Sequence, residues 1–542
     1  MPTSVHDKAY LRALIGRSIK EEKIEKAIDA LGMNIERQNA KEIEVEFQAN
    51  RPDLISTVGL ARALRYYMDR KSSFKYEAKG KSGIVVKVDR KVDKLRPYIT
   101  CLVAKNLNFT NASFLDLINF IEKFTDTFGR RRKKIAVGLH DLDKLVPPIS
   151  YTLASDEKFS ALGIGEKSYS EILETTEKGK AYKDLCTTGD AFCVLKDQAG
   201  TMALIPVINS ERTKITEHTK NIFVDITGTN SYFVNKAADL LACNFIDMGA
   251  KVYTAEVREG NTTKEAPKME TTQINVGLNL FKEEIGVFTL AFNNVIVLAN
   301  KMGIEAALVG KEIRFTVPPY RLDIMNDQDI IEDVAVAYGY DYIQPFPIVS
   351  LSQGKLDPLE ERNNVLREIM AGLGFFETMN SFVTNEDTNY TKMRLKPDIE
   401  YVRIKNAKTE TITMLRSWLL PSLLSDLAKS QHESLPHKIF ELDMTFTVRN
   451  GKPKETYHLA GVLSDSTVDL NEIKAIVGAV GKVLSADLEV KAAQHNSFID
   501  GRCGNILIKG KPKGVFGEIH PEVLENFGIG MPTVAFEIEL ED

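Results

Sequence analysis

The sequence predicts a multidomain α+β protein, and three observations lead to this prediction. Its 542 residues are 43% hydrophobic and 27% charged, a globular composition that excludes collagen-like, coiled-coil and largely disordered classes. At roughly 100 to 200 residues per domain, this length corresponds to about three to five domains. Helical apolar patterns that end in Leu-Gly or Met-Gly recur before strand-like runs at irregular spacing, which indicates αβ construction rather than a solenoid.

Polar stretches divide the chain into four expected domains. Lys71–Ser82 separates a first unit from a β-rich block, Glu256–Glu270 is a charged linker, and Pro345–Pro358 is a linker rich in Pro, Gly and Ser. The expected domains are an N-terminal αβ domain, a β-rich domain, a small helical or winged domain that bears carboxylates, and a C-terminal antiparallel-sheet domain, at residues 1–82, 83–260, 266–346 and 355–542.

Local patterns predict elements within these domains. Ile24–Leu31 has helical apolar spacing and is followed by Gly32, a residue suited to a left-handed cap, and Ile43–Phe47 reads as a strand. In the last domain we expect a helix at Val365–Leu373 and a hairpin turn at Lys509–Gly514. The alternating run Val534–Leu540 predicts a half-buried strand.

Charge and cysteine content limit the kinds of function that the sequence supports. With 70 Lys and Arg against 75 Asp and Glu, the formal net charge is -5, so an RNA contact must use local basic patches. The five cysteines are scattered and never spaced C-x-x-C, which is typical of reduced thiols and offers no zinc knuckle. Met1–Arg12 lacks signal-peptide order, and polar residues interrupt the most apolar stretch, Val287–Gly310, so we expect a cytoplasmic protein without membrane spans.

A cluster of carboxylates in Val317–Tyr342 is the sharpest local signal. Ile330, Ile331, Val334 and Tyr338 form the apolar stripe of a helix that Asn326 or Asp327 can cap. The carboxylates lie upstream of this helix or on its opposite face, at Asp323, Asp329, Glu332 and Asp333. An oxygen-only set suits a hard cation such as Mg²⁺. The alternative is an acidic first turn that complements the helix dipole.

A basic run precedes a predicted strand in the second domain. Arg130–Lys134 contains five consecutive basic residues, which can hold phosphates at the entrance of the strand or form a solvated loop. The strand ends at His140, which could carry a proton with Asp141 or Asp143 orienting it, although a lone histidine is more often structural.

Two strand ends further on are crowded with short polar residues. We expect the strand Ile205–Ile208 to deliver Asn209 and Ser210 into a turn, and the strand Ile222–Val224 to deliver Asp225, Thr227 and Thr229. Together they predict a small polar pocket, with two polar turns as the alternative. The stretch has no Ser/His/Asp or Cys/His nucleophile pattern, and the chain has no Walker-type or G-x-G-x-x-G loop.

Longer motifs, taken in order, resemble the β subunits of phenylalanyl-tRNA synthetases in their shorter archaeal or eukaryotic-like form. They cover essentially the whole chain and lie at Asn50–Leu54, Pro206–Asn209, Asp225–Thr229, Val317–Tyr342, Leu415–Pro421, Phe440–Glu441 and Gly517–Pro521. Each motif alone is modest support, whereas their shared order and spacing are specific to the family.

The resemblance implies an enzyme of two α and two β subunits that attaches phenylalanine to tRNA(Phe) using ATP. It implies that residues 83–260 edit mischarged Tyr-tRNA(Phe) by hydrolysis. Asp225 and Thr227 would then contact the substrate, and His140 is an outside candidate. The residues expected to support the water and the terminal ribose are Asn209, Ser210 and Thr229.

The resemblance has two further implications. The carboxylates Asp323, Asp329, Glu332 and Asp333 match a Mg²⁺ site shared with the α subunit. The last domain resembles a class II synthetase catalytic domain that has lost its chemistry, because His437–Glu441 lacks the arginine that would hold the α-phosphate, and Gly528–Pro532 does not end in arginine. ATP chemistry would therefore belong to the α subunit.

One function from another class stays open, a non-catalytic tRNA-binding or assembly scaffold derived from a synthetase. The presence of the whole carboxylate set favours the enzyme subunit, because an idle scaffold could lose these residues freely.

Overall fold

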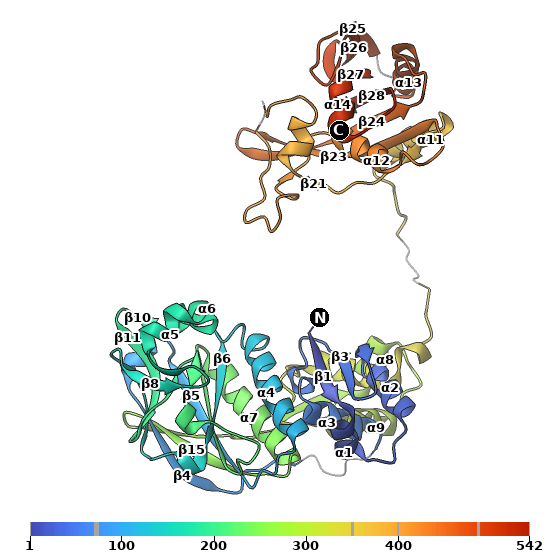
Figure 1. The fold of residues 1–542 in the computed structure, drawn as a ribbon. Helices are drawn as coiled ribbons and strands as arrows, with labels where there is room; N and C mark the ends of the chain where they lie inside the picture. The colour runs from blue at the N-terminus through green and yellow to red at the C-terminus, as the bar shows by residue number, and fades with distance from the viewer. Residues whose placement is uncertain (1, 70–74, 348–351, 398–399, 485–487, 541–542) are drawn as a thin grey trace. The chain divides into compact units, whose positions relative to one another are not determined.

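The computed structural model describes residues 2–69, 75–347, 352–397, 400–484 and 488–540. These residues form two compact units, Met1–Pro347 and Ile348–Asp542 (Figure 1). Parts of the expected boundary stretches at 71–82 and 345–358 lie outside the described residues. No helix in the described part of the chain is long and apolar enough to cross a membrane.

The first unit begins with a small αβ layer. Its antiparallel sheet has the order β1-β3-β2. The expected helix is present as α2, and Gly32 adopts a φ of +75° at its end, as the left-handed cap requires. The strand expected at 43–47 is also confirmed, as β3. The elements are β1 (Thr3–Asp7), α1 (Lys8–Ile15), α2 (Glu21–Ala30), β2 (Asn34–Gln38), β3 (Glu42–Glu46) and α3 (Thr57–Tyr67).

An eleven-stranded mixed sheet follows within the described residues. Its main path runs β13-β12-β11-β7-β4-β15-β5-β14-β6, and β10 and β16 pair with β11 and β15. Helices α4 (Asn111–Asp126) and α7 (Ser231–Asp247) pack against it, α4 on β6 and α7 on β5 and β14 (Figure 1). The strands are β4 (Lys81–Val88), β5 (Tyr98–Lys105), β6 (Ile135–Asp141), β7 (Ile149–Ala154), β10 (Thr187–Thr188), β11 (Ala191–Asp197), β12 (Gly200–Leu204), β13 (Ile208–Asn209), β14 (Ile222–Gly228), β15 (Lys251–Glu259) and β16 (Thr262–Ala266).

The structure corrects three local expectations in this region. The expected linker Glu256–Glu270 is largely a hairpin of β15 and β16, because its polar residues alternate with residues that pack into the sheet. Residues 205–207 form a turn between β12 and β13 rather than a strand. Asp225 and Thr227 do not follow a strand but lie inside β14, where both are buried between β5 and β6. A small subdomain completes the region, with β8 (Lys158–Ala161), β9 (Gly165–Ser168), α5 (Tyr169–Thr175) and α6 (Glu177–Cys186).

The first unit ends with a three-stranded antiparallel sheet in the order β17-β19-β18 and three helices. The last helix, α10, begins after Asn326, whose side chain accepts hydrogen bonds from the amides of Gln328 and Asp329. The expected helix, its cap and its apolar stripe are thereby confirmed. The elements are β17 (Thr272–Gly277), α8 (Leu278–Ile285), α9 (Phe292–Lys301), β18 (Glu305–Val309), β19 (Glu312–Val317) and α10 (Asp327–Tyr338).

The second unit is built on a seven-stranded sheet in the order β20-β23-β24-β28-β27-β26-β25. Among the described residues of this sheet, only β20 and β23 pair in parallel. The antiparallel α+β layout expected for this domain is therefore confirmed. The elements are α11 (Pro358–Gly372), β20 (Phe376–Glu377), β21 (Val383–Thr384), β22 (Met414–Leu415), α12 (Leu420–Lys429), β23 (His437–Arg449), β24 (Lys452–Ser464), α13 (Leu470–Val483), β25 (Leu488–Ala492), β26 (Phe498–Ile508), β27 (Lys511–Ile519), α14 (Pro521–Phe527) and β28 (Thr533–Glu539).

The final strand is not half-buried as expected. Val534 and Phe536 pack into the core that contains α11 and α13, while Ala535 packs into the core that contains α12 and α14, so both faces of β28 are covered. Glu537 is also buried, because its carboxylate accepts hydrogen bonds from the amides of Leu419 and Leu420 at the start of α12. The expected hairpin is tighter than 509–514, with only residues 509 and 510 between β26 and β27.

Candidate functional site

A cavity of about 380 Å³ lies in the first unit, among residues of α4, β6, the β12–β13 turn and β14. Most of its lining is aliphatic or aromatic, as in Ile118, Leu139 and Val207. Three of the residues predicted for the pocket line it, namely Asn209, Asp225 and Thr227. A volume of this kind, mostly apolar with a few convergent polar groups, is typical of a small-molecule site.

Asp225 is the most unusual group in the cavity. Its side chain is 1% exposed, and its Oδ1 lies 3.0 Å from Nε2 of His140, which is fully buried. The other nitrogen of His140 lies 2.8 Å from the hydroxyl of Thr213, so the ring is held from both sides. Within the described residues, Oδ2 of Asp225 is buried without a hydrogen-bond partner. Leaving such a group unpaired costs about 1 to 3 kcal/mol, so an arriving donor would gain a strong hydrogen bond.

The position of Asp225 depends on a glycine on the neighbouring strand. Gly138 is the register partner of Asp225 between β6 and β14. A Cβ at Gly138 would lie 2.2 Å from Oδ1 of Asp225, well inside van der Waals contact. The absence of a side chain at 138 therefore makes room for the carboxylate over the sheet.

Thr227 is held by a fully buried arginine that the sequence did not point to. Arg96 donates from Nε to the hydroxyl of Thr227 at 2.9 Å and from Nη2 to its carbonyl at 2.6 Å. Its third nitrogen donates to the carbonyl of Arg132 at 2.9 Å. The planar guanidinium thus joins β14 to the basic run 130–134 through one rigid fork.

The remaining predicted pocket residues occupy different positions. Asn209 lines the cavity and donates to the carbonyl of Leu139 at 3.1 Å. Ser210 does not line it, and its buried hydroxyl bonds the carbonyl of Ser160. Thr229 also lies outside the lining and bonds the carbonyl of Lys133 at 3.2 Å. His140 is not among the lining residues but contacts Asp225, which is.

Sequence reasoning did not single out Arg96, Thr213 or Gly138. Each matters because of a partner far away in the chain, with Arg96 bonded to residue 227 and Thr213 to residue 140. No local spacing marks such residues. Only Gly138 carried a usable signal, since a glycine inside a predicted strand often marks a close approach of another group.

The four predicted carboxylates border one small hollow, together with Asn50 and Arg51 of the N-terminal layer. They therefore lie around the same hollow. Among the described residues, however, no group of three or more His, Cys, Asp or Glu side chains is placed to hold a metal ion.

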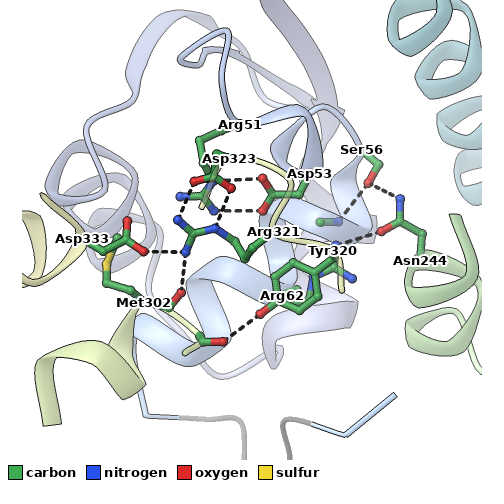
Figure 2. A network of polar contacts seen from close by, with 12 residues as sticks. Arg51, Asp53, Ser56, Arg62, Asn244, Met302, Tyr320, Arg321, Asp323 and Asp333 are labelled. Atoms are coloured by element: carbon green, nitrogen blue, oxygen red, sulfur yellow. Dashed lines mark hydrogen bonds and ion pairs between the residues drawn. The ribbon is translucent and has the colours of Figure 1, made fainter. Parts of the chain in front are cut away.

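Two arginines, Arg321 and Arg51, lie among the buried carboxylates (Figure 2). Arg321 binds Asp323 with two hydrogen bonds, of 2.9 and 2.6 Å, and its Nη1 lies 2.6 Å from Asp333. Arg51 is fixed by a similar two-bond pairing with Asp53 and lies 4.0 Å from Asp323. A guanidinium already supplies the positive charge between the two buried carboxylates, so a magnesium ion does not fit between them in the chain by itself.

Burial and nearby charges shift the pKa values of the two buried carboxylates, Asp323 and Asp333, in opposite directions. Burial would raise the pKa of Asp323, but Arg321 and Arg51 outweigh it and hold that pKa below its ordinary value. Burial raises the pKa of Asp333 above its ordinary value in spite of Arg321. Asp329 accepts hydrogen bonds from the amides of residues 325 and 326, and Glu332 is exposed.

The second unit contains a buried ion-pair network on β23, the strand that was expected to lack a phosphate-binding arginine. Glu441 on β23 lies 2.5 Å from Nη1 of Arg416, and both side chains are almost fully buried. Its other oxygen accepts a hydrogen bond of 3.0 Å from Asn380. Arg416 also lies 3.1 Å from Asp443, so its charge is balanced by carboxylates within the fold.

Comparisons with known proteins place the chain in a family. Family models match at residues 88–244 (B3/4 domain), 274–340 (tRNA synthetase B5 domain) and 344–540 (phenylalanyl tRNA synthetase beta chain CLM domain). A phenylalanine–tRNA ligase beta subunit of Thermococcus onnurineus is 35% identical over 100% of this chain and 98% of its own length. One from Archaeoglobus fulgidus is 36% identical over 94% and 93%.

A solved structure adds the fold. The crystal structure of an N-terminal fragment of the phenylalanyl-tRNA synthetase beta subunit from Pyrococcus horikoshii has a TM-score of 0.60 and 33% identity. The match covers 62% of this chain and 100% of the fragment. Fold and matches together define a component of an aminoacyl-tRNA ligase. The chain belongs to the family of phenylalanine–tRNA ligase β subunits.

Proposed function

We propose that the chain works with an α subunit to attach phenylalanine to tRNA(Phe) using ATP, and that its cavity hydrolyses mischarged Tyr-tRNA(Phe). The family supports the first part. The second part rests on one observation, the buried Oδ2 of Asp225, which has no hydrogen-bond partner in the described structure and borders a mostly apolar cavity.

The geometry favours tyrosine over phenylalanine. The two amino acids differ by one hydroxyl, and the aliphatic lining accepts either ring. A tyrosine hydroxyl would donate to Oδ2 of Asp225, whereas phenylalanine would leave that oxygen buried and unpaired. Discrimination by an unpaired polar group is strong, because the wrong ligand must bear the full desolvation cost of that group.

The chain's own side chains would position the other reacting groups. His140 holds the Asp225 carboxylate in place, and Arg96 holds Thr227. Asn209 lies on the cavity wall next to the β12–β13 turn, where it can hold the attacking water. Because no nucleophilic triad is present in the lining, the proposed hydrolysis depends on placing water and ester together.

The editing proposal is tested with Asp225→Asn in the complex with the α subunit. We expect Tyr-tRNA(Phe) deacylation to fall about 10- to 100-fold in kcat/KM, since a hydrogen bond to a charged acceptor is worth about 1.5 to 3 kcal/mol. Phenylalanine charging should not change. Asp143→Asn is a matched control, because Asp143 is exposed and outside the cavity lining. Unchanged deacylation by Asp225→Asn would refute the proposal.

The proposed division of labour places ATP chemistry in the α subunit of an assembly of two α and two β chains. The internal pairing of Arg416 with Glu441 and Asp443 supports it, since this arginine is not left to bind a phosphate. Phenylalanine charging by each chain alone and by the co-expressed chains, with sizing of the complex, tests this. Charging by the mixture alone is expected. Failure to associate would favour a scaffold instead.

Magnesium is proposed for the assembled complex only. Glu332 is exposed at the hollow and, in the described residues, makes no ion pair, so it is the carboxylate most available to a cation shared with the α subunit. We expect Mn²⁺, used as a probe for Mg²⁺, to bind the complex and to bind Glu332→Gln more weakly. Equal binding by both proteins would remove Glu332 from the site.

A further inference from the structure

The basic run at residues 130–134, here called the basic turn, has an uncommon backbone. Arg130, Arg131 and Arg132 all adopt left-handed conformations, with φ of 48°, 51° and 61°. For residues with a side chain this conformation costs roughly 1 to 2 kcal/mol each. Three consecutive cases persist only where surrounding contacts impose them, and such strain gathers at functional positions.

Contacts from three directions hold the basic turn. The amides of Arg131 and Arg132 donate to carbonyls in the last turn of α4, at 2.7 and 2.9 Å. Arg96 supports the turn from inside by donating to the carbonyl of Arg132. The side chain of Arg132 reaches the carbonyl of Pro206 at 2.9 Å and stacks over the ring of Tyr182. The turn is therefore held by contacts to α4, to Arg96 and to the β12–β13 turn.

These contacts do not engage most of the positively charged side chains of the basic turn. Arg130, Arg131 and Lys133 are exposed, and in the described part of the chain none of their side chains forms an ion pair or hydrogen bond. Arg132 is already engaged and lines the cavity. In a chain with a net charge of -5, this concentration of free cations at the edge of a pocket is a local feature that matches a polyanion.

We propose that the basic turn binds the phosphates of the single-stranded acceptor end of the tRNA whose terminal ester occupies the cavity. This inference rests on the proposed editing function. Arg96 bonds both Thr227 in the cavity wall and Arg132 in the turn, so the two sites are held at a fixed separation. An ester bound at Thr227 and Asp225 places its preceding phosphates outside the cavity, where the exposed guanidinium groups of Arg130 and Arg131 can meet them.

The binding test uses the full chain and a fluorescent single-stranded RNA hexamer that ends in CCA. Anisotropy is measured between 50 and 200 mM salt for the unaltered chain and for the double variant Arg130→Gln with Arg131→Gln. We expect the variant to bind more weakly, and the slope of log affinity against log salt to be smaller by about 1.4, because each phosphate that an arginine neutralises adds about 0.7 to the slope.

The control removes the same charge elsewhere. Lys87 and Lys251 are exposed on β4 and β15, which contribute no residue to the cavity. The double variant Lys87→Gln with Lys251→Gln should keep the affinity and slope of the unaltered chain. Equal losses in both double variants, or no measurable binding by the unaltered chain, would overturn the proposal.

Two further readouts separate the possible failures. If the turn only neutralises the negative end of the α4 dipole, Arg130→Gln with Arg131→Gln should lower the melting temperature but leave RNA binding unchanged, which also overturns the proposal. In the complex, we expect the variant to raise KM for Tyr-tRNA(Phe) deacylation with little change in kcat. If the unaltered complex does not deacylate this tRNA, the editing proposal fails, while hexamer binding still decides the role of the turn.

Discussion

Single residues set the shape of the cavity, and Gly138 shows this most directly. We predict that Gly138→Ala removes the deacylation activity as fully as Asp225→Asn, because the new methyl group would displace Oδ1 of Asp225 and break its bond to His140. Overpacking of this kind also costs about 1 to 3 kcal/mol of stability. Deacylation kinetics and melting temperature measure both effects.

Gly478→Ala is the control for that substitution, because a Cβ at Gly478 on α13 meets no atom of the described residues within 4 Å. It should leave deacylation unchanged. Full activity in Gly138→Ala would show that the carboxylate can adopt another position in the cavity.

A buried histidine makes the N-terminal layer sensitive to acid. His6 bonds the hydroxyls of Ser4 and Thr57, and burial together with the charge of Lys123 lowers its pKa to about 3. Its unfolded pKa is near 6.5, so its contribution to stability is complete above that pH and is lost as pH falls toward 3. At pH 5 this loss is about 2 kcal/mol.

Asp116 acts in the opposite sense, since burial raises its pKa to about 6. Its contribution is complete below about 3.9, its ordinary pKa, and is lost as pH rises through 6.

We predict that His6→Gln loses about 2 kcal/mol less stability than the unaltered chain between pH 7.5 and 5, measured by urea unfolding. His218→Gln, at an exposed histidine, should behave like the unaltered chain. Identical pH dependence in all three would show that His6 does not resist protonation.

At the scale of elements, Arg96 connects β14 to the basic turn. We predict that Arg96→Lys lowers kcat for deacylation about 10-fold and destabilises the chain by about 1 to 3 kcal/mol, because one ammonium cannot serve Thr227 and Arg132 in the same fork and leaves a buried carbonyl unpaired. Arg90→Lys in the same loop is the control, since its side chain is 72% exposed. Normal kinetics in Arg96→Lys would mean that charge alone suffices.

Arg321 joins α10 to the end of α9, because it pairs with Asp333 on α10 and donates to the carbonyl of Met302. We predict that Arg321→Met destabilises the chain by about 3 to 5 kcal/mol, because Asp323 and Asp333 would stay buried without their partner. Chelation of divalent ions should leave the melting temperature of the unaltered chain unchanged. A drop in melting temperature on chelation would show that a metal ion, and not Arg321, balances these carboxylates.

On the scale of the whole molecule, buried polar contacts join segments that the polar stretches of the sequence had assigned to separate domains. Arg62 on α3 binds Asn244 on α7 and lies against Tyr320 (Figure 2). It also pairs with Asp247 on α7, and its guanidinium lies 4.0 Å from the centre of the Tyr320 ring. Three of the four expected domains meet in these contacts. Together with an apolar core that the same three segments share, these contacts hold the first unit together.

We predict that Arg62→Met uncouples this unit. Calorimetry should show the N-terminal layer and the eleven-stranded sheet melting as separate transitions, with a loss of about 3 kcal/mol, because the buried ion pair between Arg62 and Asp247 would be lost. Arg65→Met on the same helix is the control, since Arg65 is only half-buried. A single cooperative transition in Arg62→Met would show that apolar packing alone holds the unit together.

Much of the fold could be predicted because its signals are local. The helix α10, its cap at Asn326 and the left-handed end of α2 at Gly32 follow from residues within one or two turns. The half-buried prediction for β28 was wrong, because an alternating pattern cannot show that helices cover both faces. The linker at 256–270 was wrong for a related reason, since polar residues also occur on the exposed side of a hairpin.

The sequence by itself indicated the family, the elements with local signals such as α2 and α10, and the residues that can carry charge or hydrogen bonds in each segment. Only the tertiary structure decided which of them meet. It placed Asp225 against His140 and Gly138, and it set Arg321 between carboxylates that had been predicted to hold a metal ion. Helical and strand periodicity arise from neighbours along the chain, whereas the charge state and hydrogen-bond partners of a buried group depend on residues far away in it.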